Sequence, residues 1–291
     1  QSNNVYDVVA HYGADNTGVV DSTDAINTAI QDAISAGSGV VVIPSGSSIT
    51  DDEIILASDS TTDTVNVHIH GYGAKITSSS VTNILRIGNT DSANGNTQWC
   101  TVKGIYLITS TALTGVMIDG FYTFNNTLSD MVIEGAWPPV ANTCGVTVMD
   151  KVVTTGSGSY FNTIENSEIR QWDKNLSIGY DWGNALDCAE APNVFKVRNV
   201  TFNWFRTYGV YLKTAGYNEI HGFFNGGYTT RAAATLTPSA TSGSITLTTS
   251  ADVFTANDVG RTVGNISAGE AGSAIITAYG SATSVTATTQ T

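Results

Sequence analysis

The chain has 291 residues, which gives room for one large domain or one domain with a small appendage. Charged residues make up only 13% of it and hydrophobic residues 41%, which excludes a disordered chain and a charge-rich helical bundle and favours a sheet-rich globular protein. The formal net charge of -13 excludes nucleic acid as a partner, because a phosphate backbone binds basic residues. No apolar run approaches the ~20 residues that span a bilayer, so we expect a soluble protein with no membrane insertion.

The cysteines and histidines show no metal-binding pattern. Three cysteines, Cys100, Cys144 and Cys188, leave an odd one, and none has a C-x-x-C or Cys/His spacing. A free cysteine is usually a small buried hydrophobe, so we expect buried thiols in place of a disulfide framework. His68 and His70 share one strand face but lack a third ligand. We therefore expect no metal site and no cofactor.

One stretch near the start has the pattern of a helix. Asp21 and Ser22 are N-capping residue types, and Ala and Ile then recur at helical spacing until Gly37. The pattern predicts an amphipathic helix over 22–36, whose apolar stripe lies against a larger body. The run 40–43 contains only Val and Ile and is closed by a proline, which predicts a short buried strand.

Four motifs in this part of the chain carry a resemblance to a known family. They are Tyr6-Asp7-Val8, Tyr12-Gly13-Ala14-Asp15-Asn16-Thr17-Gly18, Asp21-Ser22-Thr23-Asp24-Ala25-Ile26 and Gly39-Val40-Val41-Val42-Ile43-Pro44-Ser45-Gly46. Together they resemble the N-terminal signature of the pectate-lyase-like superfamily, which includes phage tailspikes, alginate epimerases, polygalacturonases and some glucanases. The resemblance implies an all-β fold, a right-handed parallel β-helix, with residues 1–50 as its N-terminal cap and first strand. It specifies a fold better than a reaction.

The chain then repeats with a period of about 30 residues. An apolar anchor is followed two places later by Gly, Asp or Asn at Ile69, Val102, Leu128, Ile164, Val197 and Ile220. Two apolar residues around one exposed position recur from Leu85, Val116, Val146, Leu176 and Val210. Each period thus holds at least two short strands at a fixed offset, which is typical of a solenoid. The pattern predicts about six rungs within 51–232, with Gly, Asp or Asn forming left-handed bends.

The composition changes from residue 233. Thr, Ser and Ala fill 33 of the 59 remaining positions. Alternation at 244–248 and 284–288 predicts antiparallel strands over a small core. The stretches 253–261 and 275–279 resemble a small β module of phage tail proteins. We therefore expect 233–291 to form a separate antiparallel β module.

The catalytic motifs of several relatives are missing. Polygalacturonases carry Asn-Thr-Asp, Asp-Asp, Gly-His-Gly and Arg-Ile-Lys in that order, whereas here only Asn89-Thr90-Asp91 and a misplaced Asp51-Asp52 occur. The Asp-Pro-His-Glu motif and the calcium-binding glycine repeats of alginate epimerases are absent from the sequence. The phage tailspikes remain, a family whose catalytic carboxylates follow no common motif.

We therefore select candidate catalytic carboxylates by their position in the repeat. Asp119, Asp150 and Asp181 each lie just past the second strand of successive rungs. Rung spacings of ~4.8 Å and ~9.6 Å bracket the carboxylate separations of retaining and inverting glycosidases. An Asp after a strand is also ordinary turn chemistry, and this alternative stays open.

A second group of acids occupies the first strands or the positions just after them. Its members are Glu134, Glu165, Glu168 and Asp173, with Arg170 beside them. If Ile169 points inward, Glu168 and Arg170 face outward together. An acid, a base and an arginine that holds a uronate or sulfate would suit polysaccharide cleavage. A surface salt bridge explains the same residues equally well.

All five tryptophans lie inside the predicted rungs. Sugar rings stack their C–H faces on aromatic planes, so exposed tryptophans along a coil would make a glycan track. We expect Trp137 and Trp182, which are on turns, to bind sugar, and Trp172 and Trp204 to add further contacts. Phe202, inside a strand, is expected to point into the core.

Together with the resemblance, these features predict a phage tailspike that binds and depolymerises a host surface polysaccharide: capsule, exopolysaccharide or O-antigen. The enzyme would be a glycoside hydrolase or a polysaccharide lyase. The predicted catalytic residues are Asp150, Glu168 and Asp181, and the predicted substrate contacts are Trp137, Arg170, Trp172, Trp182 and Trp204. The resemblance also implies a homotrimer in the virion tail, outside the cell, in contact with other tail proteins. Two alternatives stay open: a non-catalytic receptor-binding or structural tail fibre of the same fold, and a secreted bacterial pectate-lyase-like enzyme.

Overall fold

The computed structural model describes residues 4–57, 65–88, 96–118, 123–148, 159–179, 194–212, 218–227, 235–264 and 273–290. The chain divides into two compact units, residues 1–229 and 230–291. Each unit has a hydrophobic core of its own. Within the described ranges, no helix is long and apolar enough to cross a bilayer.

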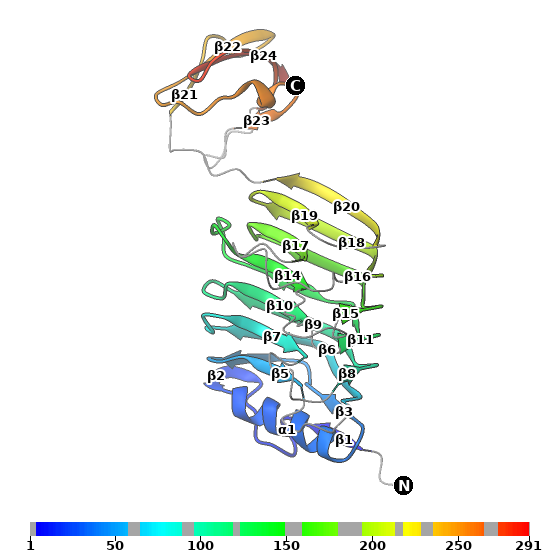
Figure 1. Ribbon diagram of the computed structural model, residues 1–291. Helices are drawn as coiled ribbons and strands as arrows, with labels where there is room; N and C mark the ends of the chain where they lie inside the picture. Colours follow the sequence, from blue (N-terminus) through cyan, green and yellow to red (C-terminus); the bar gives the residue numbers. More distant parts are fainter. Residues whose placement is uncertain are drawn as a thin grey trace. The chain divides into compact units, whose positions relative to one another are not determined.

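The first unit is a right-handed parallel β-helix, in which the described residues form three sheets whose strands stack rung upon rung (Figure 1). In the described residues the longest sheet consists of β1 (Val5–Asp7), β2 (Thr17–Asp21), β3 (Gly39–Val42), β4 (Ser47–Thr50), β6 (Val67–Ser78), β9 (Thr101–Thr109), β12 (Thr127–Ser129), β13 (Val132–Glu134), β16 (Thr163–Arg170), β18 (Lys196–Phe205) and β20 (Glu219–Gly227). The second sheet consists of β5 (Ile54–Leu56), β7 (Asn83–Ile87), β10 (Thr114–Ile118), β14 (Cys144–Val148), β17 (Lys174–Ile178) and β19 (Tyr208–Leu212). The third consists of β8 (Thr97–Gln98), β11 (Thr123–Phe124) and β15 (Ser159–Tyr160).

The strand register explains the repeat in the sequence. The predicted anchors form one column across the long sheet, in the order Ile69, Val102, Leu128, Ile164, Val197 and Ile220. The second pattern forms a column across the second sheet, in the order Leu85, Val116, Val146, Leu176 and Val210. Except for the last member of each, these side chains are buried, and removing stacked aliphatic surface from water stabilises the coil. The predicted fold class is confirmed.

The residues two places after the anchors turn the chain at four of the rungs. Their backbone is left-handed at Gly104 (φ 70°), Asp130 (φ 54°), Asn166 (φ 49°) and Asn199 (φ 51°). Gly, Asn and Asp tolerate this conformation at the lowest cost. In the rung of Gly71 the bend falls instead on Tyr72 and Gly73, which both have positive φ. The residue types at the bend were therefore predictable from the sequence. The position of the bend shifts by one residue in β6, where the strand register is irregular.

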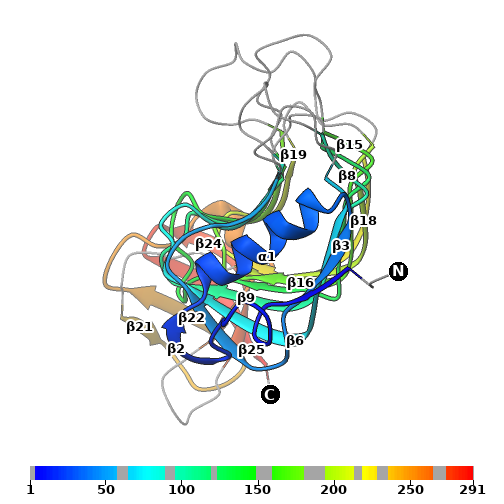
Figure 2. The same cartoon turned by 90° about the horizontal axis from the view of Figure 1, so that it is seen from below.

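One end of the coil is covered by α1 (Thr23–Ser35), which crosses the first rung in the end-on view of Figure 2. The helix begins one residue after its predicted start and ends one residue before its predicted end. Its buried face consists of Thr23, Ile26, Ala29, Ile30, Ala33 and Ile34. The apolar stripe predicted from the sequence thus packs onto the core of the coil.

Side-chain amides of α1 pair with the edge of β5, which an open coil would leave unpaired. Asn27 Nδ2 donates to the Glu53 carbonyl at 2.9 Å, and Asn27 Oδ1 accepts from Ile55 N at 2.9 Å. Gln31 Nε2 donates to the Ala57 carbonyl at 3.0 Å. Asn27 therefore makes the two hydrogen bonds that another strand would make, which protects this edge from pairing with other chains.

Buried asparagines tie successive rungs together at the corner between the third and the long sheet. Asn162 Nδ2 donates to the Thr123 carbonyl at 3.0 Å, and Asn162 Oδ1 accepts from Asn126 N at 3.0 Å. One rung earlier, Asn126 Oδ1 accepts from Cys100 N at 2.9 Å. At this corner the chain leaves the sheets, so some backbone groups have no partner in a neighbouring strand. The asparagine side chains provide hydrogen bonds to these groups.

The second unit contains one antiparallel sheet. Its described strands are β21 (Leu236–Pro238), β22 (Ser244–Thr249), β23 (Thr262–Gly264), β24 (Ser273–Ser281) and β25 (Ser284–Gln290), with a short 3-10 helix, η1 (Ala256–Asp258), between β22 and β23. Its core consists of Ile245, Leu247, Phe254, Ala274, Ile276, Val285 and Ala287. The two strands predicted from alternation are β22 and β25, which pair with each other.

Candidate functional site

A group of polar side chains lies on the outer surface of the long sheet, across four neighbouring rungs. Two outward columns hold Tyr106, Val132 and Glu168, and Glu134, Arg170 and Asn203. The residues between the columns are Ile133, Ile169 and Phe202, all of them fully buried. Because successive side chains of a strand alternate between its two faces, the flanking residues face outward, as predicted for Glu168 and Arg170. Phe202 points into the core, also as predicted.

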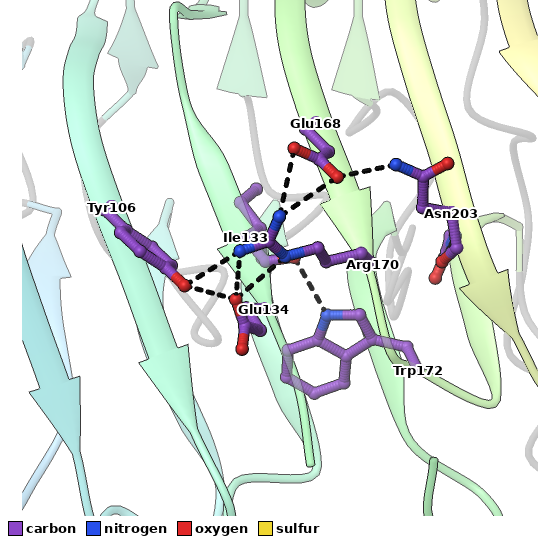
Figure 3. A network of polar contacts seen from close by, with 8 residues as sticks. Tyr106, Ile133, Glu134, Glu168, Arg170, Trp172 and Asn203 are labelled. Atoms are coloured by element: carbon purple, nitrogen blue, oxygen red, sulfur yellow. Dashed lines mark hydrogen bonds and ion pairs between the residues drawn. The ribbon is translucent and has the colours of Figure 1, made fainter. Parts of the chain in front are cut away.

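Arg170 is the centre of this group (Figure 3). Its Nε and Nη2 donate to Glu134 Oε2 at 2.8 and 2.5 Å. Its Nη1 donates to the two carboxylate oxygens of Glu168 at 3.2 and 3.3 Å. Tyr106 donates its hydroxyl proton to Glu134 and accepts from Arg170 Nη2 at 2.9 Å. Asn203 Nδ2 donates to Glu168 Oε1 at 2.6 Å, so the network around Arg170 includes side chains from β9, β13, β16 and β18.

The site is half-buried, and its electrostatics follow from that burial. Burial alone would lower the pKa of Arg170, but hydrogen bonds to Glu134 and Tyr106 outweigh it and raise the pKa above its ordinary value. Burial, and then the hydrogen bond to Glu134, raise the pKa of Tyr106. At neutral pH Arg170 is therefore charged and Tyr106 keeps its proton, so the phenol acts as a donor to Glu134.

Two exposed tryptophans border the polar group. The Trp204 ring centroid lies 6.0 Å from Arg170 Cζ, and Trp137 meets Trp204 edge-on with ring centroids 6.0 Å apart. Trp137 is 57% exposed and Trp204 41% exposed. Trp204 has a left-handed backbone (φ 48°) near the end of β18. The structure thus brings four predicted site residues, Trp137, Glu168, Arg170 and Trp204, to one face of the coil.

Trp172 was predicted as a substrate contact, and this prediction is wrong. Its side chain is 1% exposed, and its Nε1 donates to the Ile133 carbonyl at 3.2 Å inside the core. The ring fills space left by glycines: a Cβ at Gly135 would lie 2.8 Å from Trp172 Cδ2, and one at Gly145 would lie 2.9 Å from Cδ1. A side chain without exposed surface has no face to offer a sugar ring.

The remaining predicted site residues lie apart from this face or outside the described residues. Asp150, Asp181 and Trp182, together with Asp119 of the proposed carboxylate column, fall outside the described ranges. Asp173 is buried beside Arg206, with Asp173 Oδ1 3.4 Å from Arg206 Nη1. Glu165 lies on the other half of β16, in register with Arg198.

Sequence reasoning missed Tyr106 and Asn203. Both are placed by the cross-rung register, which pairs Tyr106 with Val132 and Asn203 with Arg170. Aligning the rungs on their anchors and listing the outward positions beside Glu168 and Arg170 would have found them.

Metal binding and thiol chemistry find no support within the described part of the chain. No group of three or more His, Cys, Asp or Glu side chains there could hold a metal ion. Cys100 and Cys144 are free and buried, and burial raises the pKa of each thiol to about 12. Such thiols stay protonated at neutral pH and are poor nucleophiles. Cys188 lies outside the described residues.

Comparisons with known proteins bear on the fold. No protein-family model and no curated protein matches the chain. Among solved structures, PfbA, a surface adhesin of Streptococcus pneumoniae, is 15% identical over 77% of this chain and 61% of its own, with a TM-score of 0.50. ORF18 of Geobacillus virus E2 is 12% identical over 98% of this chain and 76% of its own, with a TM-score of 0.43. The tailspike protein of Acinetobacter baumannii phage AM24 is 16% identical over 80% of this chain and 46% of its own, with a TM-score of 0.48. The likeness to the adhesin, of whose chain this one spans about three fifths, is a likeness of fold.

Proposed function

We propose that the chain is the β-helix part of a phage tailspike, which binds a host surface polysaccharide on the face around Arg170 and depolymerises it there. The observation that carries the proposal is the meeting of exposed Trp137 and Trp204 with the Arg170 ion pairs on one outer face. The fold supports it, because rungs spaced ~4.8 Å apart present side chains along a surface that suits an extended polymer. On this proposal the protein acts outside the cell, in a virion tail, as a homotrimer among other tail proteins.

The chemistry of the face suits a sugar ring. The aromatic planes of Trp137 and Trp204 can stack on sugar C–H faces, while carboxylate oxygens accept hydrogen bonds from sugar hydroxyls. The two glutamates outnumber the single arginine between them, so this face favours a sugar residue that offers hydroxyl groups over one that brings another negative charge.

Glu134 and Glu168 form the candidate catalytic pair. They lie on adjacent strands and two positions apart, which separates their Cα atoms by roughly 8 Å. The Arg170 guanidinium lies between their carboxylates, so a substrate has to displace it from one of them. We assign Glu168 as the acid–base residue. The Glu168 side chain is 28% exposed, whereas that of Glu134 is 14% exposed. Glu168 also has the longer hydrogen bonds to Arg170, so a substrate separates Glu168 from the arginine more readily.

A non-catalytic receptor-binding tail protein is the second candidate. This candidate is favoured by the ion pairs of Arg170, which hold the carboxylates of both Glu134 and Glu168. In that case the network serves to keep the binding face rigid.

Binding and cleavage assays on polysaccharide separate these functions. Capsular polysaccharide and lipopolysaccharide from a panel of candidate hosts provide the probes. Trp204→Ala should weaken binding by ~1 to 3 kcal/mol, which is about 5- to 150-fold in Kd. Trp99→Ala is the matched control, because Trp99 is an exposed tryptophan as well, at 57% against 41% for Trp204, and lies on another part of the coil. Equal binding by the two variants would place the site elsewhere.

The cleavage arm uses Glu168→Gln. Removing one carboxylate of a working pair should lower the rate of release of reducing ends or unsaturated uronate by ~10² to 10⁴ while leaving Kd nearly unchanged. Binding by the wild-type protein without either product would support the non-catalytic candidate.

A further inference from the structure

The outer surface of the long sheet carries a second group of charged side chains, in the rungs of β6 and β9. His70 of β6 is in register with Lys103 of β9, and the ring centroid of His68 lies 6.3 Å from that of His70. Ile69, between the two histidines, and Val102, directly before Lys103, are buried in the core. The two histidines and the lysine therefore face outward together, and these three residues form the histidine cluster.

Positive charge is scarce in this chain, which has 12 Lys and Arg against 25 Asp and Glu. Each of the five described arginines lies within 3.6 Å of a carboxylate. Among the described residues, by contrast, no carboxylate forms an ion pair with a member of the histidine cluster. Burial lowers the pKa of His70, and the charges of Lys103 and His68 lower it further. An anion at this place would relieve that repulsion.

On one side, the cluster is bordered by uncharged side chains. Val42 of β3 is in register with His70, and Asp7 of β1 lies beyond it, two strands and ~9.6 Å from His70. Asp7 Oδ1 already accepts hydrogen bonds from two backbone N–H groups at 3.0 and 2.9 Å. Tyr72, on the same strand as the histidines, meets the His70 ring edge-on, with centroids 6.1 Å apart.

On the other side, a serine separates the cluster from the next charged residues. Ser129 of β12 is in register with Lys103, and Glu165 of β16 lies beyond it. Glu165 is itself in register with Arg198 of β18, which lies on the side away from Lys103. The nearest carboxylates of the long sheet in these registers, Asp7 and Glu165, are thus each two strands away.

The histidine cluster is continuous with the Arg170 face. Lys103 and Tyr106 both belong to β9 and are three residues apart, which is at most ~10 Å. Lys75 of β6 adds a further cation between them and the end of the sheet, with Nζ 5.8 Å from the centroid of the Tyr106 ring. Arg170 Cζ lies 5.7 Å from the same centroid. One extended polymer can therefore contact the cluster and the Arg170 face at the same time.

We propose that the histidine cluster is a subsite for a sugar residue with an anionic substituent, a carboxylate or a sulfate. The inference rests on the proposed function and specifies its substrate class. Half-buried imidazolium and ammonium groups form charge-assisted hydrogen bonds with such an anion, and salt screens them less than fully exposed groups. The Arg170 face, with two glutamates to one arginine, suits a neutral sugar. The polysaccharide would then contain both acidic and neutral sugars.

The test measures histidine pKa values by NMR. Protein with isotope-labelled histidine rings is titrated between about pH 5 and 8, the range in which imidazoles gain their charge. The titration is repeated at constant ionic strength with D-glucuronate, D-glucose 6-sulfate or D-glucose. A bound anion favours the charged imidazole, so we expect at least one of the two anionic sugars to raise the pKa of His70, and glucose to leave it unchanged. The sugar that raises it identifies the substituent, and a rise with both shows that the negative charge alone is recognised.

His221 is the internal control. Its side chain is 71% exposed and its Nε2 lies 3.3 Å from a carboxylate oxygen of Glu219, so the anionic sugars should leave its pKa in place. Equal rises at His70 and His221 would show general screening and overturn the subsite. The absence of any rise at His70 would overturn it as well.

Binding and protonation are coupled, so the affinity should depend on pH. The lowered pKa leaves the His70 imidazole largely neutral at pH 7, where Lys103 binds the anion with little help. As the pH falls through the pKa of His70, the affinity should rise, by up to about tenfold for each unit by which the bound anion raises that pKa. An affinity that stays constant while His70 gains its proton would contradict the proposal.

Lys103→Met should weaken binding of the anionic sugar by about tenfold or more, since hydrogen bonds to charged groups are the strong ones. It should also raise the pKa of His70 in the sugar-free protein, because Lys103 lowers it. Lys196→Met removes the same charge from β18 of the same sheet and should change neither quantity. Equal affinities of the two variants would overturn the subsite.

The outcomes separate this subsite from the proposed function. The monosaccharide titrations involve no polymer and no tryptophan. A negative result in them, beside polysaccharide binding that depends on Trp204, rejects the subsite alone. Anion binding at the histidine cluster without any polysaccharide binding rejects the proposed function alone.

Discussion

At the scale of single residues, Arg170 holds the outer face of three strands together. Its guanidinium pairs with Glu134 and Glu168 and hydrogen-bonds Tyr106, and all three ionised side chains are less than a third exposed. Without the arginine, two carboxylates on adjacent strands would face each other with only the neutral donors Tyr106 and Asn203 bonded to them. Ion pairs of this kind cost more to break than exposed ones contribute.

Arg170→Met should therefore lower the free energy of unfolding of the β-helix by about 2 to 3 kcal/mol at neutral pH. Arg198→Met is the matched control: Arg198 also pairs with a glutamate across two strands, at 3.4 Å, but both side chains are about half exposed. It should change stability by less than ~1 kcal/mol. Urea unfolding followed by circular dichroism measures both, and equal losses in the two variants would contradict the difference in burial.

The sequence predicts only those site residues whose orientation depends on a single strand. Alternation around Ile169 places Glu168 and Arg170 outside, because that rule needs no neighbour. Tyr106 and Asn203 lie beside them because of the register between strands of different rungs. The anchors that set this register are 33, 26, 36, 33 and 23 residues apart, because the loops differ in length. Trp172 follows the end of β16, where alternation no longer applies, and glycines from other rungs leave the space that it fills.

At the scale of elements, the helix at the end of the coil combines a predictable feature with an unpredictable one. The Ile and Ala stripe was readable because helical periodicity is local. The pairing of Asn27 and Gln31 with the edge of β5 was not, since it depends on how the helix axis lies along that strand. The stripe buries apolar surface, while the amides satisfy the strand edge.

Ile30→Asp should give insoluble or unfolded protein. Ile30 is fully buried beneath α1, and a carboxylate there would lose its hydration without gaining a partner, while the loosened helix would expose the edge of β5. Thr28→Asp introduces the same charge on the exposed side of the same helix and should give soluble, normally folded protein. Solubility and far-UV circular dichroism of the two variants provide the measurement. A soluble Ile30→Asp protein with the native spectrum would show that the helix does not protect the coil.

At the scale of the whole molecule, the two units follow two different rules of composition. Columns of Val, Ile, Leu and Phe fill the coil, whereas beyond residue 233 small Thr, Ser and Ala side chains surround a core in which seven of the described residues are buried. The described strands of the antiparallel sheet pair with one another, and β24 and β25 are joined by a short turn. Because each unit has a core of its own, we expect each to fold on its own.

Brief digestion with trypsin should therefore cut first in 228–234, after Arg231, and leave residues 1–231 resistant. This segment lies outside the described residues, as do Lys151 and Lys213, two further trypsin sites within the β-helix. Arg231→Gln removes the site and should slow the first cut by trypsin. Elastase, which cleaves after Ala232, Ala233 or Ala234, should separate the units of the variant as fast as those of the wild type. Mass spectrometry of the fragments identifies each cut, and the resistant fragment should melt at the temperature of the β-helix in the full chain. If the first cuts fall at Lys151 or Lys213, or if both parts are digested and melt together, the units do not fold independently.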